Sequence, residues 1–498
     1  MAAEHLLAFD AGTSGVRALI ARPGAGTVAV ARREWQYETT PEIAPFGKAF
    51  DAERFWSILC EAARAALKDA GLAGKDIAAV GVTSQRLGVV VIDRDGRALF
   101  TGPNVDARAF VEGLGIDAQM AGRVYASTGK LPSLLLAPAR LRWLRNHRAA
   151  DFERAAAVLA IGDWVAYRLT GALRSERSLA GDCGLLDIST RERNTELLAE
   201  LDVPDGLLPP LVRSDEIAGA VTSGAAKETG LAADTPVVIA GGDTQCALLG
   251  MGVTEPGEVG IAAGWSCPLQ QVTAEPRIDV QRRTWTSLHV VPDRWVVESS
   301  TANAGQVWDW WCHTLLGDGA AALEEAAALV EQASTLGGDV FALLGPAAMN
   351  AGAMGLHQGG VLMTTPLAVG AVGRAELLRA ALENIAYALR ANLEQAEDVT
   401  GQPATRIATG GGLTRVPLFA RVLADALGRP VEVARDADVT GRGAAILAAR
   451  GIGAVSEGLS AGMEQIEPEA AAAATHQSKY ERWRRLGQAL DALREGLS

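Results

Sequence analysis

The sequence contains few cysteines, few aromatic residues and no long apolar run. Its 498 residues include five cysteines, an odd number, and no two of them form a CxxC pair. This composition argues against a disulfide framework and against a cysteine zinc site. No apolar stretch approaches the roughly 20 residues that a membrane span needs, and the run 6–9 is too short for a signal peptide. We therefore expect a cytoplasmic protein without a membrane partner.

Positive charge is also in deficit. Lysine and arginine number 46 against 59 aspartates and glutamates, which gives a formal net charge of −13. A protein that binds nucleic acid needs a basic footprint, so no nucleic-acid partner is expected. Hydrophobic residues make up 49% of the chain and charged residues 21%, as is typical of globular proteins. The length predicts more than one domain.

A strand–turn–strand pattern occurs twice. The segment HLLAFDAGTSGVRALIAR (5–22) is echoed by GEVGIAAGWSCPLQQVTA (257–274), with AGTS (11–14) aligned on AGWS (263–266). Each segment would open one half of the chain. The echo predicts two related α/β domains, each beginning with a β-hairpin.

Other elements are predicted from periodicity and glycine turns. Residues 374–399 form an amphipathic pattern whose apolar stripe contains Leu378, Leu382, Ile385, Leu389 and Leu393, which predicts a helix. Further along, 416–427 and 443–450 read as helices, 431–434 as a strand, and 477–497 as a terminal helix. Six of the 11 tryptophans lie between residues 265 and 311, and we expect most of them in the core.

The first hairpin carries candidate phosphate-binding groups. The backbone N–H groups and hydroxyls of Gly12, Thr13 and Ser14 can face phosphate oxygens, with Arg17 close by. A carboxylate at a strand end, here Asp10, can hold Mg²⁺ through water. A polar turn with a structural aspartate explains the same pattern equally well.

Two glycine-rich turns follow strands in the second half. The strand 235–240 ends in Gly241-Gly242-Asp243, and Asp243 could act as general base for a hydroxyl or could cap the helix that begins near Thr244. The turn 410–412 consists of three glycines. It would let an adenine or ribose approach the backbone closely, or it is simply a tight turn.

Polar residues also gather at two strand ends in the first half. The segments Ser84-Gln85-Arg86-Leu87 and Asn104-x-Asp106-x-Arg108 carry side chains that suit the hydroxyls of a polyol. The alternative for the second segment is a surface ion pair between Asp106 and Arg108.

Taken together and in this order, these segments resemble the FGGY carbohydrate kinases from about residue 5 to about residue 453. DAGTSGVR resembles the family's first phosphate hairpin, and SQRLGVVVIDRDGRAL with NVDARA resembles its sugar-contact segment. VVIAGGDTQCALLGMGVTEPGEVGIAAGWS resembles the catalytic aspartate and the second phosphate hairpin. GGGLTRVPLFARVLADALGRPVEV and DVTGRGAAILAA resemble the nucleotide domain. NVDARA and DWVAYRLTG are most similar to autoinducer kinases, and xylulokinases and gluconokinases remain open.

The resemblance implies an α/β, actin-like ATPase fold with two ribonuclease-H-like domains flanking a cleft. It implies a sugar-binding domain over residues 1–240, a nucleotide-binding domain over 241–455 and a helical tail over 456–498. The implied activity is ATP-dependent phosphorylation of a hydroxyl of a sugar or polyol, with a homodimer left open. The alternative is a catalytically degenerate kinase that acts as a sugar or nucleotide sensor.

The resemblance also implies site roles. Asp243 would be the general base and, with Asp10, a ligand of Mg²⁺. The residues expected at ATP are Gly12, Thr13, Ser14, Arg17, Gly264, Ser266, Gly410, Gly411 and Gly412, and those expected at the substrate are Gln85, Arg86, Asp106, Asp243 and Thr244. Two positions depart from the family pattern: Trp265 replaces a threonine, and Asp438 replaces a glutamate. Trp265 is the support for the sensor alternative.

Overall fold

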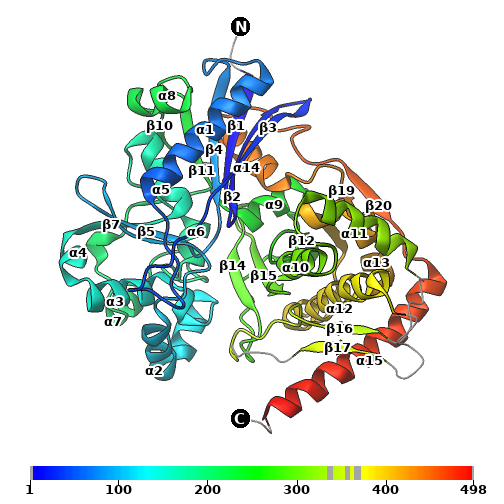
Figure 1. The fold of residues 1–498 in the computed structure, drawn as a ribbon. Coiled ribbons are helices and arrows are strands. Elements are labelled where there is room, and N and C mark those ends of the chain that lie inside the picture. Colours follow the sequence, from blue (N-terminus) through cyan, green and yellow to red (C-terminus); the bar gives the residue numbers. More distant parts are fainter. Residues whose placement is uncertain (1–3, 334–339, 354–358, 364–371, 496–498) are drawn as a thin grey trace. The chain divides into compact units, whose positions relative to one another are not determined.

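The computed structural model describes residues 4–333, 340–353, 359–363 and 372–495, and the chain divides into two compact units (Figure 1). Unit 1 comprises Met1–Pro256, Val272–Val296 and Asp438–Ala461. Unit 2 comprises Gly257–Gln271, Val297–Ala437 and Gly462–Ser498. The domain boundaries expected near residues 240 and 455 stay predictions, and residues 496–498 of the expected tail lie outside the described residues.

The sheet of unit 1 has the strand order β10-β11-β4-β1-β2-β3. Its strands are β1 (His5–Ala11), β2 (Gly15–Arg22), β3 (Gly26–Glu34), β4 (Ile77–Ser84), β10 (Ile217–Ala220) and β11 (Pro236–Gly242). β1 pairs antiparallel with β2 and parallel with β4, which in turn pairs parallel with β11. Because parallel strands end at the same edge of a sheet, Asp10, Gln85 and Asp243 come from neighbouring positions on one edge.

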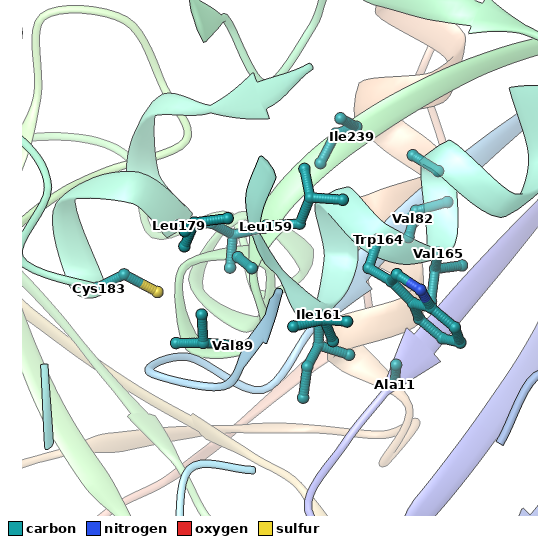
Figure 2. Close-up of a cluster of buried hydrophobic side chains, with 14 of the residues drawn as sticks. Ala11, Val82, Val89, Leu159, Ile161, Trp164, Val165, Leu179, Cys183 and Ile239 are labelled. Carbon is teal, nitrogen blue, oxygen red and sulfur yellow. The ribbon is translucent and has the colours of Figure 1, made fainter. Parts of the chain in front are cut away.

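Both faces of this sheet are buried in unit 1. On one face, Ala11, Val82 and Ile239, from the three parallel strands, belong to one apolar cluster with Trp164 and Val165 of α5 (Ile161–Thr170), as Figure 2 shows. The helix α1 (Ala52–Ala70) also contributes to this cluster. On the other face, Leu6 and Ala8 of β1 lie in a cluster formed with α9 (Asp243–Gly250) and α14 (Val439–Gly451). A rigid core therefore supports the strand ends that carry the polar residues.

The helix α14 packs closely on α9, the helix that begins with Asp243. Gly443 of α14 lies so close to α9 that a Cβ atom there would be 1.9 Å from the carbonyl oxygen of Cys246. Only glycine permits this approach of two helix backbones. Figure 1 shows α14 beside β1, although more than 400 residues separate them in the sequence.

The remaining helices and strands of unit 1 lie outside this six-stranded sheet. They are β5 (Val89–Asp93), β6 (Ala98–Gly102), α2 (Phe110–Thr128), α3 (Ala137–His147), α4 (Ala149–Arg154), β7 (Ala155–Ala160), β8 (Ser175–Glu176), α6 (Arg177–Asp182), α7 (Thr195–Glu200), β9 (Leu211–Val212), α8 (Ser223–Thr229) and β14 (Trp285–Leu288). β5 lies between β6 and β7 in a separate sheet.

Unit 2 repeats the pairing pattern of unit 1. Its sheet contains β13 (Pro268–Thr273), β12 (Glu258–Ala262), β18 (Arg406–Gly410), β19 (Val431–Ala434) and β20 (Met463–Ile466) in that order. β12 and β13 form the antiparallel hairpin, and β18 and β19 add in parallel, as β4 and β11 do in unit 1. Both β-hairpins predicted from the sequence echo are therefore confirmed.

Helices complete unit 2. The predicted amphipathic helix is confirmed as α12 (Arg374–Thr400), and all five residues of its predicted stripe are buried. The other elements are β15 (Trp295–Ser300), which begins in unit 1, α10 (Ala304–Leu316), α11 (Ala320–Gln332), β16 (Phe341–Leu343), β17 (Gly360–Leu362), α13 (Pro417–Leu427) and α15 (Ala470–Glu495). No helix in the described ranges is both long enough and apolar enough to cross a membrane.

The tryptophan prediction is confirmed for four of the six residues. Trp295, Trp308 and Trp311 are buried, and Trp285 is partly buried against an apolar cluster. Trp265 and Trp310, which belong to none of the apolar clusters, have 40% and 51% of their surface exposed.

Candidate functional site

The first hairpin of unit 1 places an ion pair beside its turn. Asp10 lies opposite Arg17 in the β1–β2 register, and Arg17 Nη1 is 2.9 Å from Asp10 Oδ2. Burial raises the pKa of Asp10, and the Arg17 cation opposes that rise. Arg17 Nε also lies 3.5 Å from Asp438 Oδ1, and Arg32 Nη2 lies 2.7 Å from the same oxygen. Two carboxylates and two guanidinium groups therefore alternate beside the hairpin, with Arg32 coming from β3 and Asp438 from the start of α14.

Asp243 is the first residue of α9. Its Oδ1 accepts a hydrogen bond of 2.8 Å from the backbone N–H of Thr244, and Arg86 Nε lies 3.9 Å from the same oxygen. The side chain keeps 26% of its surface exposed, yet it lies deep enough for desolvation to raise its pKa to about 7. The charge of Arg86 lowers this pKa and the charge of Asp10 raises it further. Asp243 thus changes protonation near neutral pH.

A buried network behind Arg86 was not anticipated from the sequence. Asp182 accepts hydrogen bonds from Ser287 Oγ at 2.8 Å and from Gln245 Nε2 at 2.9 Å, and Lys130 Nζ lies 2.8 Å from its Oδ1. Arg86 Nε is 3.9 Å from its Oδ2. Burial alone would raise the pKa of Asp182, but Lys130 and Arg86 hold it below its usual value. Arg86 therefore lies between an ionised, buried Asp182 and the more accessible Asp243.

The ring of Trp285 covers both cations of this network. Its centroid lies 5.0 Å from Lys130 Nζ and 5.9 Å from Arg86 Cζ, distances at which a cation is attracted to an indole face. The indole N–H donates a hydrogen bond of 2.6 Å to the carbonyl of Leu131, which fixes the ring. No signal in the sequence distinguishes Trp285 from the tryptophans expected in the core.

Gln85 joins the first hairpin to the segment around residue 104. Its Nε2 donates to the carbonyl of Gly12 at 3.0 Å and to the hydroxyl of Tyr37 at 2.9 Å, and its Oε1 accepts from the backbone N–H of Asn104 at 2.9 Å. Gln85 is fully buried. Its amide is therefore engaged within the protein and orients its neighbours.

Asp106 and Arg108 form the ion pair that the sequence left open as an alternative, but the pair is buried and not at the surface. Arg108 Nε lies 2.9 Å from both carboxylate oxygens, and the two side chains are 4% and 0% exposed. The guanidinium group lies over the rings of Phe100 and Trp143, which removes the pair from water. A substrate-binding role for Asp106 stays a prediction.

In unit 2 the second hairpin and the glycine turn are neighbours. The backbone N–H of Ala263 donates to the carbonyl of Gly410, and that of Leu413 donates to the carbonyl of Ala263. Gly411 has a φ of 131°, and a Cβ there would lie 2.7 Å from the Ala263 carbonyl oxygen, so a side chain would clash. Gly264, Trp265 and Ser266 are the turn of this hairpin.

The expected site residues thus fall into two groups, each described within its own unit. Unit 1 brings together Asp10, Gly12, Thr13, Ser14, Arg17, Gln85, Arg86, Asp243 and Thr244. Unit 2 brings together Gly264, Ser266, Gly410, Gly411 and Gly412. Within the described parts of the chain, no group of three or more histidine, cysteine, aspartate or glutamate residues is arranged to hold a metal ion. The ATP, Mg²⁺ and substrate roles of individual residues stay predictions.

Comparison with known proteins gives this arrangement its context. Residues 5–250 match the N-terminal domain of the FGGY family of carbohydrate kinases, and residues 261–452 match the C-terminal domain of that family. An autoinducer-2 kinase of Escherichia coli (strain SMS-3-5 / SECEC) is 32% identical over 476 residues, which cover 91% of this chain and 87% of the relative.

Solved structures of carbohydrate kinases have the same fold as this chain. The xylulose kinase from Rhodospirillum rubrum superposes with a TM-score of 0.84 at 25% identity, covering 98% of this chain and 99% of that one. The gluconate kinase from Lactobacillus acidophilus has the same fold, with a TM-score of 0.85 at 19% identity and 99% coverage of both chains. The predicted α/β, actin-like ATPase fold is therefore confirmed. With both family domains matched in order along nearly its whole length, the chain belongs to the FGGY family of carbohydrate kinases.

Proposed function

We propose that this carbohydrate kinase transfers the terminal phosphoryl group of ATP to a hydroxyl of a sugar or polyol, with Asp243 as general base. The observation that carries the proposal is the raised pKa of Asp243. A general base works best when its pKa lies near the working pH, and the pKa of Asp243 is raised to about 7. Its position at the sheet edge beside Arg86 supports the same role.

The two oxygens of Asp243 have different surroundings. Oδ1 accepts the Thr244 N–H and faces Arg86, so it is oriented and stabilised as an anion. We assign the proton of the attacking substrate hydroxyl to Oδ2. As the hydroxyl attacks the phosphorus atom, its proton moves to Oδ2 and the bond from phosphorus to the leaving oxygen of ADP breaks. Arg86, which has donors and no acceptor, would orient an oxygen of the substrate.

The nucleotide would be held by backbone and side-chain donors. Supporting groups are the hairpin turn 12–14 and Arg17, whose side chain is 43% exposed, in unit 1. In unit 2 they are the hairpin turn 264–266 and the glycines 410–412. ATP supplies the phosphoryl group, and Mg²⁺ neutralises charge on its phosphates.

Asp10 and Asp243 would be the carboxylates that hold Mg²⁺ through water. Their chemistry fits a hard cation, which takes oxygen ligands. The charge of Asp10 raises the pKa of Asp243, so the two carboxylates repel each other. A bound divalent cation would relieve this repulsion.

The test is a coupled ADP-release assay over a panel of sugars and polyols, with a control that lacks sugar. The panel includes autoinducer-2, D-xylulose and D-gluconate, which are the acceptors named for the relatives. ADP release that depends on one class of acceptor supports the proposal. ADP release without acceptor, or none with any acceptor, contradicts it.

A further inference from the structure

The side-chain amide of Asn104 is hydrogen-bonded at one end and unpaired at the other. Its Nδ2 donates a hydrogen bond of 2.8 Å to Thr13 Oγ1, in the turn of the first hairpin. Its Oδ1 is buried, and within the described part of the chain it has no hydrogen-bond partner. An acceptor in this state is uncommon, because nearly all buried polar atoms are paired.

The rest of Asn104 is firmly held, so the unpaired oxygen does not result from a loosely placed residue. Its backbone N–H donates to Gln85 Oε1 at 2.9 Å, and Gln85 is itself fixed by Gly12 and Tyr37. On either side of Asn104, the carbonyls of Pro103 and Asp106 accept hydrogen bonds from the buried Arg140 at 3.0 Å and 2.9 Å. Such support is what a preorganised binding group needs.

The hydrogen bonds of Asn104 connect it to the strand ends that carry the reacting groups of unit 1. Its amide nitrogen contacts Thr13, in the turn that follows β1, and its backbone contacts Gln85, which directly precedes Arg86 at the end of β4. Arg86 Nε lies 3.9 Å from Asp243 Oδ1. A buried acceptor left unpaired destabilises the protein unless a ligand donates to it. A hydroxyl of a bound sugar is such a donor.

We propose that Asn104 is a specificity-determining residue whose Oδ1 accepts a hydrogen bond from a substrate hydroxyl other than the one that is phosphorylated. The inference rests on the proposed function, because it assumes that a sugar or polyol binds beside Asp243. It deepens that function by specifying the substrate class. Asp243 takes the reacting hydroxyl, Arg86 donates to an oxygen, and Asn104 requires a second hydroxyl. A substrate with a methylene or an ether oxygen at that position would be rejected, since it would leave the buried acceptor unpaired.

The test removes the hydrogen bond from each side in turn. Wild type and Asn104→Leu are assayed with the acceptor found in the ADP-release panel and with its monodeoxy analogues; for D-xylulose these are the 1-, 3- and 4-deoxy compounds. In wild type, kcat/KM should fall about ten- to a hundredfold for one deoxy analogue. In Asn104→Leu, kcat/KM for the parent sugar should fall to that same level, so that kcat/KM is equal for the parent sugar and this analogue. The KM for ATP is measured as well, because Asn104 Nδ2 also holds Thr13 of the hairpin turn, and any change in it should be the same with the parent sugar and with the analogues.

Two further variants separate recognition from folding. Asn104→Asp keeps an acceptor oxygen and should restore most of the discrimination. Asn146→Leu removes an exposed asparagine of the same unit. It should leave the ratio of kcat/KM between the parent sugar and the deoxy analogue as in wild type. If Asn104→Leu lowered kcat/KM by the same factor for the parent sugar and for all its analogues, Asn104 would only support the fold. That result would overturn the inference.

The wild-type protein alone also tests the inference, so a variant that fails to fold does not end the experiment. Wild-type activity that no deoxy analogue reduces would overturn the role of Asn104 while leaving the proposed function intact. Absence of ADP release with every acceptor would overturn the proposed function, and the inference with it.

Discussion

The Nε atom of Arg86 lies 3.9 Å from Oδ1 of Asp243. At this distance the guanidinium group stabilises the ionised carboxylate without a direct hydrogen bond from that nitrogen. Desolvation pushes the pKa of Asp243 up and Arg86 pulls it down, and the balance is a carboxyl group that titrates near pH 7. Under the proposed function, the pair would set both the strength of the base and the place where the substrate oxygen binds.

Replacing Asp243 by asparagine should abolish most of the kinase activity. The change is nearly isosteric but removes the base, so kcat should fall by roughly 10²–10⁴, while sugar binding measured by calorimetry stays close to wild type. Asp234→Asn, at an exposed position of the same unit with φ of 64°, is the control and should keep full activity. Retention of more than about a tenth of wild-type kcat in Asp243→Asn would require a different base.

The activity should rise with pH through neutrality. Because the pKa of Asp243 is raised to about 7, the group is protonated and inactive as a base below that pH and ionised above it. Because this pKa belongs to the free protein, kcat/KM for the sugar should fall about tenfold per pH unit below pH 7 and level off above it. The measurement is a kcat/KM profile for the sugar from pH 5 to 9. A profile that is flat through pH 7 would contradict the assignment.

Arg86→Ala should weaken sugar binding more than ATP binding. Arg86 carries several donors, and hydrogen bonds from charged groups are stronger than neutral ones, so the sugar KM should rise about tenfold or more. Arg54→Ala, which removes an exposed arginine with 67% of its side chain accessible, serves as the control. An unchanged sugar KM with an altered ATP KM would show that Arg86 acts on the nucleotide instead.

Breaking the ion pair of Lys130 and Asp182 should destabilise the protein, whereas removing both charges should not. Both side chains are 1% exposed, so Lys130→Met would leave the buried carboxylate with only Arg86, at 3.9 Å, as a neighbouring cation and would cost about 3–5 kcal/mol of unfolding free energy. The double variant Lys130→Met/Asp182→Asn should recover most of this loss. Urea unfolding measures both, and Arg123→Met, at an exposed ion pair, should hardly change the midpoint. Equal urea unfolding midpoints for Lys130→Met and the double variant would contradict the prediction that the loss comes from the broken ion pair.

Trp265→Thr tests whether the indole hinders the nucleotide. The side chain is 40% exposed on the turn of its hairpin, where its backbone carbonyl accepts a hydrogen bond from Gly305. We expect wild type to bind Mg·ATP in calorimetric titrations and Trp265→Thr to keep or modestly lower the KM for ATP. If wild type showed no ATP binding and the variant restored it, the sensor alternative would be favoured.

Features that depend on local pattern were predictable from the sequence. The two hairpins follow from matching residues around AGTS and AGWS, and α12 was expected to within one residue because its apolar stripe is regular. The start of α14 was placed four residues late, at 443 instead of Val439. Gly441 and Gly443 interrupt the helical signal there, and their function is close packing, which no periodicity reveals.

Features that depend on distant residues were not predictable. Lys130, Asp182 and Ser287 are far apart in the sequence and belong to no motif, yet they meet in one buried network. The spacing of Asp106 and Arg108 indicated their pairing but could not indicate their burial, since Phe100 and Trp143 supply the cover. The unpaired Oδ1 of Asn104 is visible only once its neighbours are placed.

The division of the chain into units limits which fragments of the protein can contain a whole unit. The chain passes from one unit to the other after residues 256, 271, 296, 437 and 461. A fragment that ends near residue 250 would lack α14, whose alanines complete the cluster against Leu6 and Ala8 of β1. No single cut in the gene yields either unit whole. Recombination that exchanges one whole unit between relatives would therefore have to exchange three separate segments together.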